Sequence, residues 1–209
     1  LRSLDCSYFK AGPIDVSSNT ELISLVCNYC DFTTLDVSSN SELRILECNY
    51  NNLTSLDVSN NTKLQELACP NNKLTALDLN SNTELERLEC GRNNLSSLDV
   101  SRNTKLWLLD CHYNKLTSLD VSSNTKLQLL SCEDNNLSSL DVSNGIKLVE
   151  ICCQSNNLAS LDLSSNTKLA KFNCGSNPGE NGIFRVMAPW IDNGAIPQDF
   201  TTGSWQYDG

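Results

Sequence analysis

The residues of this 209-residue chain with the clearest potential for chemistry are its eleven cysteines. Nine of them recur every 21 residues, at Cys6, Cys27, Cys48, Cys69, Cys90, Cys111, Cys132, Cys153 and Cys174. A disulfide needs Cα atoms within about 7 Å of each other and converging Cβ vectors. The fixed interval instead predicts stacked turns about 4.8 Å apart, with parallel Cβ vectors. We therefore expect free thiols that pack in the core as small apolar side chains.

Two cysteines lie outside this ladder. Cys30 forms a single Cys-x-x-Cys motif with Cys27, without a second pair or a nearby histidine, so we favour a structural role over zinc binding or redox chemistry. Cys152 occupies an outward-facing strand position. It is therefore the thiol whose reactivity is worth testing.

His112 is the only histidine, and the repeat places Asp110 and Ser131 on the same face. These are the residue types of a hydrolase triad, but the sequence offers no nucleophile elbow, oxyanion hole or closed pocket. A second alternative is a cation held by Glu89, Asp110, His112 and Glu133. We favour neither alternative, and we expect no enzymatic activity, no resident metal and no cofactor.

An aspartate also recurs in every turn. The column comprises Asp15, Asp36, Asp57, Asp78, Asp99, Asp120, Asp141 and Asp162. Carboxylates stacked about 4.8 Å apart have the ligand type and spacing to bridge calcium ions. Stacked carboxylates also repel one another, and backbone N–H groups in a turn can offset that repulsion. We therefore favour a structural role for these residues.

One repeated frame gives all these residues their positions. In residues 43–63 it comprises Leu43, Leu46, Cys48, Asn51, Leu53, Leu56, Asp57, Val58, Ser59, Asn61 and Thr62. Apolar residues alternate around Leu46 and Cys48, which predicts a short strand with these two side chains inside and Ile45 and Glu47 outside. One turn buries too little apolar surface to fold alone, so the turns must stack.

Two asparagine columns complete the scaffold. The first comprises Asn51, Asn72, Asn93, Asn114, Asn135, Asn156 and Asn177. We expect its amides to satisfy backbone groups of adjacent turns. The second comprises Asn19, Asn40, Asn61, Asn82, Asn103, Asn124 and Asn166, with Gly145 as the exception. It is interpreted as a column of turn or cap residues.

The frame L-x-x-L-x-C-x-x-N-x-L-T-x-L-D-V-S-x-N-T-x resembles the 21-residue repeat of internalin J-type leucine-rich-repeat proteins and of related bacterial surface proteins of gut anaerobes. The resemblance covers residues 1 to about 177. It implies a right-handed leucine-rich-repeat solenoid, α/β by convention but mostly β. Nine turns would form a concave parallel sheet with short irregular or 3-10 convex segments. It also implies a secreted or cell-surface location and a role in adhesion or partner binding.

The ends of the chain depart from the frame. Residues 1–177 are expected to form the solenoid and residues 178–209 a C-terminal cap, with the start of another domain as the alternative. Phe9 and Cys30 replace asparagine, so the first turns are expected to be distorted. Because the chain opens partway through a repeat, we expect a fragment, with any signal or anchor outside it.

Composition narrows the choice of partners. The formal net charge of -10 opposes binding to nucleic acid phosphates. No apolar run approaches the roughly 18 residues that cross a bilayer, so no membrane insertion is expected from this chain.

Function is expected on the concave face. The position two after each ladder cysteine holds Tyr8, Tyr29, Tyr50, Asn71, Arg92, Tyr113, Asp134, Ser155 and Ser176. The predicted ligand-binding residues are Tyr8, Tyr29, Tyr50, Arg92, Trp107, Asp110, His112 and Tyr113. Tyrosine, tryptophan and arginine are enriched at binding hot spots. We predict a module that binds a protein or a glycan. The alternatives are a structural spacer that displays another domain and a metal-dependent or hydrolytic site near His112.

Overall fold

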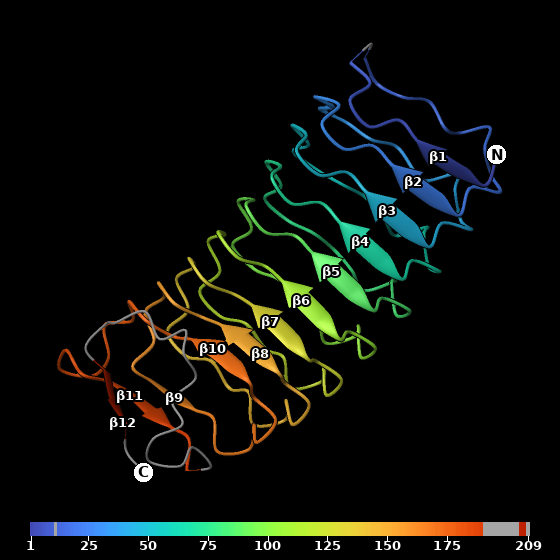
Figure 1. Cartoon of the computed structure of the whole chain (residues 1–209). Helices are drawn as coiled ribbons and strands as arrows, with labels where there is room; N and C mark the ends of the chain where they lie inside the picture. Colours follow the sequence, from blue (N-terminus) through green and yellow to red (C-terminus); the bar gives the residue numbers. More distant parts are fainter. Residues whose placement is uncertain (11, 190–204, 208–209) are drawn as a thin grey trace.

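The computed structural model describes residues 1–10, 12–189 and 205–207, and nine of its strands form one parallel sheet (Figure 1). These strands are β1 (Ser3–Asp5), β2 (Ser24–Val26), β3 (Ile45–Glu47), β4 (Glu66–Ala68), β5 (Arg87–Glu89), β6 (Leu108–Asp110), β7 (Leu129–Ser131), β8 (Glu150–Cys152) and β10 (Lys171–Asn173). They lie side by side in chain order. Each strand pairs with the residues 21 positions further along, as Leu25 does with Leu46. The predicted period is thereby confirmed.

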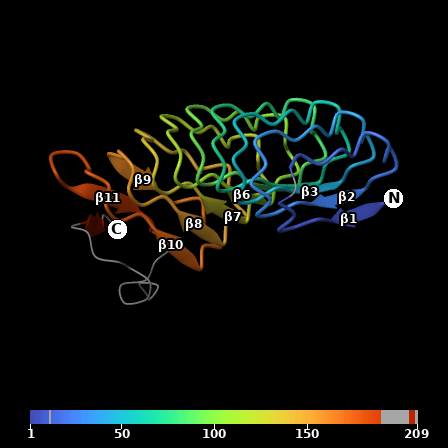
Figure 2. The same cartoon turned by 90° about the horizontal axis from the view of Figure 1, so that it is seen from above.

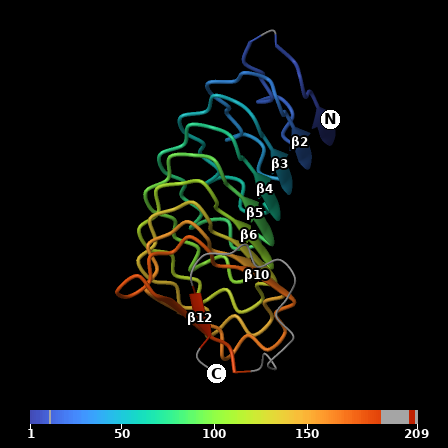
Figure 3. The ribbon, with the colours of Figure 1, turned by 60° about the vertical axis from the view of Figure 1, so that its left-hand side comes forward.

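The strands line one side of the molecule, and the segments that connect them form the other side (Figures 2 and 3). These segments are turns and bends, and the described residues contain no helix. The expected leucine-rich-repeat solenoid of nine turns is therefore confirmed, with irregular rather than 3-10 connections. It follows that no described helix has the length and apolar character needed to span a bilayer.

The interior is a stack of leucine and cysteine side chains. From β2 to β8 the middle residue of each strand is buried, and the ladder cysteines from Cys27 to Cys174 are buried beside it. All eleven cysteines are free thiols, as predicted. Burial raises the pKa of the Cys69 thiol to about 12, because a thiolate loses its hydration in the core. The ladder therefore consists of packing residues.

The first asparagine column bridges adjacent turns, as predicted. The Asn51 amide donates to the carbonyl of Cys27 at 2.8 Å and to that of Cys48 at 3.0 Å. Its oxygen accepts the backbone N–H of Phe32 at 3.0 Å. In the preceding turn the Cys30 thiol replaces the amide and donates to the carbonyls of Cys6 and Asn28, both at 3.3 Å. Cys30 therefore has the structural role that we favoured over zinc or redox chemistry.

The second asparagine column was interpreted as turn or cap residues, and the structure gives it a larger role. Asn61 is buried, and its amide donates to the carbonyls of Val37 at 3.0 Å and Asn40 at 2.9 Å in the preceding turn. The same two contacts recur from Asn40 to Asn124 and at Asn166. This column therefore joins the turns on the side opposite the first column.

The aspartate column stabilises the turn that follows it. The Asp57 carboxylate accepts the backbone N–H of Ser59 at 2.9 Å. This hydrogen bond, followed by that of the Ser59 hydroxyl, lowers the pKa of Asp57. The same backbone contact occurs at Asp15, Asp36, Asp78, Asp99, Asp120, Asp141 and Asp162. The turn N–H groups therefore account for the column without a bridging cation.

A second sheet joins the last repeats to the residues that follow them. It consists of β9 (Ser160–Asp162), β11 (Phe184–Met187) and β12 (Trp205–Tyr207), in the order β12-β11-β9. Phe184, Val186 and Ala188 are buried with the core. A capping role for residues 178–209 stays a prediction, because Trp190 and Phe200, two of the aromatic residues behind it, lie outside the described residues.

The second asparagine column generates a stability prediction. We expect Asn103→Ala to lower the free energy of unfolding by about 1 to 3 kcal/mol, because it removes two buried amide hydrogen bonds between turns and leaves the carbonyls of Leu79 and Asn82 with only their turn N–H donors. Chemical denaturation of the full chain measures the loss. Asn80→Ala is the matched control, since Asn80 is exposed and only its backbone N–H is bonded. Equal losses in the two variants would contradict the role of the column.

Candidate functional site

Three tyrosines form a continuous exposed stack at the N-terminal end. The ring centroids of Tyr8 and Tyr29 lie 5.1 Å apart with 3° between the planes, and those of Tyr29 and Tyr50 lie 4.3 Å apart with 9°. Their relative exposures are 68%, 37% and 47% in chain order. Burial and the neighbouring Tyr50 hydroxyl raise the pKa of Tyr29. We call these three side chains the tyrosine stack.

The stack does not lie on the strands, where the sequence placed its column. Each tyrosine follows the end of its strand by three residues and has a positive φ, of 65° at Tyr8, 58° at Tyr29 and 53° at Tyr50. The whole column shares this left-handed conformation: Tyr8, Tyr29, Tyr50, Asn71, Arg92, Tyr113, Asp134, Ser155 and Ser176. These residues therefore occupy the turn at the carboxyl end of the sheet, next to the strands rather than on them.

A second group of predicted residues meets around Tyr113. The Arg92 guanidinium lies 4.3 Å from the centroid of the Tyr113 ring, a cation–π geometry. The His112 ring meets the Tyr113 ring edge-on, with centroids 5.6 Å apart. The His112 Nδ1 atom lies 2.5 Å from an Asp110 carboxylate oxygen. We call Arg92, Asp110, His112 and Tyr113 the central cluster.

Gly91 makes room for the histidine. A Cβ atom at this position would lie 2.3 Å from His112 Nδ1, so a larger residue would displace the imidazole. This contact was not predicted, although Gly91 is the residue 21 positions before His112 in the same column. Arg87 on β5, which was not predicted either, forms ion pairs with Glu66 and Glu89 on the sheet face. These pairs leave the Arg87 charge neutralised.

Trp107 stands apart from both groups. It precedes β6, whereas Tyr113 follows that strand, so the two residues lie at opposite ends of the sheet. Its relative exposure is 36%, and Leu108 beside it is half-buried. The structure thus gathers the predicted residues into the tyrosine stack, the central cluster and Trp107. One turn, that of Asn71, separates the first two groups.

The comparisons with known proteins bear on the fold. No family model and no curated protein matches the chain. Among solved structures, the functional domain of InlJ from Listeria monocytogenes, which includes a cysteine ladder, is 34% identical, with a TM-score of 0.57 over 84% of this chain and 49% of that chain. An internalin (InlF) from the same species is 21% identical, with a TM-score of 0.78 over 85% of this chain and 55% of that chain.

The chain is a leucine-rich-repeat solenoid with a cysteine ladder. A third match is the leucine-rich-repeat ectodomain of the Arabidopsis thaliana receptor kinase GASSHO1/SCHENGEN3, solved in complex with CASPARIAN STRIP INTEGRITY FACTOR 2. It is 19% identical, with a TM-score of 0.80 over 99% of this chain and 26% of that chain. The chain spans about half the length of the two Listeria structures. The resemblance predicted from the repeat is confirmed.

The two catalytic alternatives gain no support from the solenoid. Ser131 is the strand neighbour of Asp110, and within the described residues no hydrogen bond links it to His112. In the same part of the chain, no three histidine, cysteine, aspartate or glutamate side chains are grouped to hold a metal ion. Glu133, the other carboxylate whose charge acts on His112, is half-buried, and burial raises its pKa.

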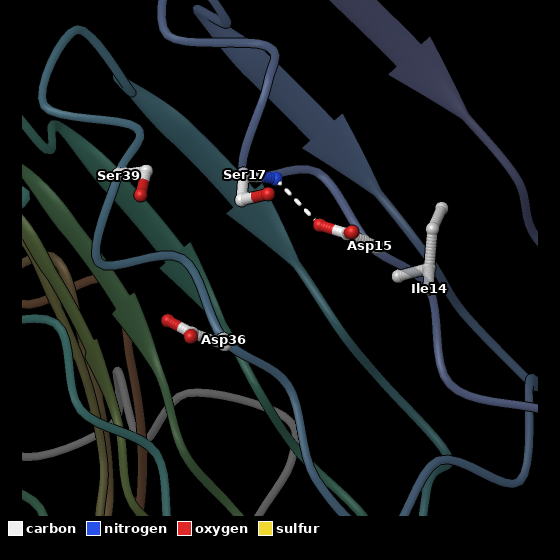
Figure 4. Close-up of a pocket in the computed structure, with 5 residues that line it drawn as sticks. All are labelled: Ile14, Asp15, Ser17, Asp36 and Ser39. Atoms are coloured by element: carbon white, nitrogen blue, oxygen red, sulfur yellow. Dashed lines mark hydrogen bonds between the residues drawn. The ribbon is translucent and has the colours of Figure 1, made fainter.

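The aspartate column borders shallow hollows between turns. The one in Figure 4 has a volume of about 220 Å³ and is lined by Ile14, Asp15, Ser17, Asp36 and Ser39. Its Asp15 carboxylate turns toward the backbone N–H of Ser17, 2.9 Å away, rather than toward Asp36 (Figure 4). The lining therefore serves the local turn.

Cys152 was singled out as the thiol to test. It lies half-buried on the outer face of β8, where burial, followed by the charge of Glu133, raises its pKa to about 11. At pH 8 we expect iodoacetamide to label it about a hundredfold more slowly in the folded chain than in the unfolded chain, because the thiolate is scarcer. Mass spectrometry of the labelled peptides measures both rates. Equal rates would show that the thiol is not shielded.

The Asp110–His112 contact generates a titration prediction. The hydrogen bond to Asp110 raises the pKa of His112 above 6.5, and it outweighs burial, which lowers it. We expect Asp110→Asn to lower this pKa, measured by NMR titration. The contact should stabilise the fold below pH 6.5, and the gain should vanish as the pH rises through the folded-state pKa. Glu89→Gln is the control, and an unchanged His112 pKa in Asp110→Asn would contradict the assignment.

Proposed function

We propose that this solenoid is a non-enzymatic protein-binding module of a secreted or cell-surface protein, acting in adhesion. The observation that carries the proposal is the tyrosine stack, three large aromatic side chains held exposed in one row. The central cluster continues the same edge of the sheet, one turn beyond the stack. Exposed aromatic and arginine side chains on a rigid scaffold are the usual anchors of protein interfaces.

Rigidity supports this role. A tyrosine buries a large area at an interface, but ordering a free side chain costs about 0.5 to 1.5 kcal/mol. In the stack each ring is already held by its neighbour, and the Tyr113 ring is held between Arg92 and His112. The entropy cost is therefore met during folding, and more of the contact energy remains for a partner.

The geometry favours a protein over a glycan. Both faces of the Tyr29 ring are covered, by Tyr8 on one side and Tyr50 on the other. A sugar that stacks on an aromatic side chain needs a free ring face, and in this stack only the two end rings, Tyr8 and Tyr50, keep a face that no other tyrosine covers, so most of the stack presents ring edges and hydroxyl groups. Edges and hydroxyls suit backbone carbonyls, amides and apolar side chains, the groups that a polypeptide presents.

The similar structures support the class of function and the location. Internalins and the ectodomain of a plant receptor kinase share this fold, and the plant ectodomain was solved in complex with CASPARIAN STRIP INTEGRITY FACTOR 2. The internalin-like repeat supports a secreted or surface location for the whole protein. A spacer that displays another domain would share the fold but would have no use for the tyrosine stack.

Paired tyrosine variants test the proposal. Native chain is titrated against panels of purified extracellular proteins and of glycans by surface plasmon resonance. For the protein ligand found, we expect Tyr29→Ala with Tyr50→Ala to weaken binding by about thirtyfold, equivalent to about 2 kcal/mol. Tyr29→Phe keeps the stack and reports on the hydroxyl alone.

Ser59→Ala, on the exposed turn after Asp57, is the matched control and should bind like the native chain. Absence of any ligand, or unchanged binding by the double variant, would support the spacer instead. Binding to glycans alone would contradict the protein ligand.

A further inference from the structure

One surface column changes its charge along the solenoid. Its members lie six residues after those of the aspartate column and are Glu21, Glu42, Lys63, Glu84, Lys105, Lys126, Lys147 and Lys168. Each glutamate of the column has a basic partner. Glu21 lies 3.8 Å from Arg2, Glu42 lies 2.6 Å from Lys63, and Glu84 lies 2.6 Å from Lys105. The first five positions are therefore neutralised in pairs.

The last three positions differ. Lys126, Lys147 and Lys168 are exposed, and none of them forms an ion pair or side-chain hydrogen bond within residues 1–10, 12–189 and 205–207. They occupy equivalent positions of three consecutive turns, which stack in register through β7, β8 and β10. Their Cα atoms are therefore spaced by about 4.8 Å in a straight row. We call these residues the lysine row.

The side chains along the row are uncharged. Thr125, Ile146 and Thr167 precede the three lysines, and Gln128, Val149 and Ala170 follow them by two residues. Glu150, the strand carboxylate that follows Lys147 by three residues, is paired with Lys171 at 2.8 Å. Across the preceding turn the column of Asp120, Asp141 and Asp162 accepts backbone N–H groups. Three ammonium groups thus repel one another, which an anionic ligand would relieve.

We propose that the lysine row binds a linear acidic polysaccharide. Its carboxylates or sulfates recur at regular intervals along an extended chain, as the ammonium groups do along the solenoid. Thr125, Gln128 and Thr167 supply polar groups for sugar hydroxyls. Duplex nucleic acid fits poorly, because its phosphates recur about every 3.4 Å along the axis on each strand, whereas the lysine row has a spacing of about 4.8 Å.

This site is separate from the proposed protein-binding surface. The lysine row precedes β7, β8 and β10, whereas the tyrosine stack follows β1, β2 and β3. Trp107, two residues after Lys105, lies at the end of the row and also belongs to the candidate surface. It is left unchanged in the test, so the two proposals can fail independently.

The test compares two triple variants with the same change in net charge. Lys126→Gln, Lys147→Gln and Lys168→Gln remove the row. Lys63→Gln, Lys73→Gln and Lys115→Gln remove three lysines elsewhere. Binding of the full chain to immobilised polygalacturonate and heparin is measured by surface plasmon resonance, with neutral dextran as the reference. Circular dichroism checks that both variants fold, which exposed Lys→Gln changes should permit.

We expect the native chain and the control variant to bind the acidic polymers and not dextran. Loss of the lysine row should weaken binding by about tenfold or more, since each exposed ion pair contributes a modest share of the binding free energy. Binding should vanish at about 1 M salt, where the Debye length is about 3 Å. No binding by the native chain, equal losses in the two variants, or equally tight binding to single-stranded DNA would overturn the proposal.

Discussion

The hydrogen bond from a buried asparagine amide to the carbonyls of two adjacent turns is the constraint on which this structure depends. Irregular connections leave backbone carbonyls inside the solenoid that no helix or strand can satisfy. Asn51 donates to two such carbonyls, one of them in the preceding turn. Asn61 donates to two carbonyls of the preceding turn, each of which also accepts a backbone N–H of that turn. Each repeat therefore has to return its amides to the same position beside the preceding turn.

Strict register decides what the surface can display. Every outward position lies about 4.8 Å from the equivalent positions of the adjacent turns. Side chains at the same position of the repeat are therefore neighbours. For Tyr29 and Tyr50 the result is a favourable stack. For aspartates it is repulsion, which the Ser59-type backbone N–H groups offset. For Lys147 and its neighbours the structure supplies no such compensation. One geometric rule thus stabilises one column and leaves another with unbalanced charge.

The sequence alone predicts the features that depend on the repeat period and on side-chain polarity. The inward cysteines, the bridging role of Asn51 and the strand positions follow from these properties. Backbone conformation does not follow from the period or from side-chain polarity. Nothing in the residue types Tyr, Arg and Ser signals the positive φ shared by Tyr29, Arg92 and Ser155, since such values usually mark glycine or asparagine. The space that Gly91 leaves for His112 depends on stacking between turns, which one repeat viewed alone does not contain.

Departures from the frame show how the scaffold tolerates change. The Cys30 thiol donates to the carbonyls of Cys6 and Asn28, so a different donor preserves the connection between turns. Gly145 has no side chain to donate, yet its own carbonyl still accepts the Asn166 amide at 2.9 Å. Each connection uses the side chain of one turn and the backbone of the previous one. A turn that lacks its amide can therefore still accept the amide of the next turn. The residues of the outward columns can vary while the register of the turns is kept.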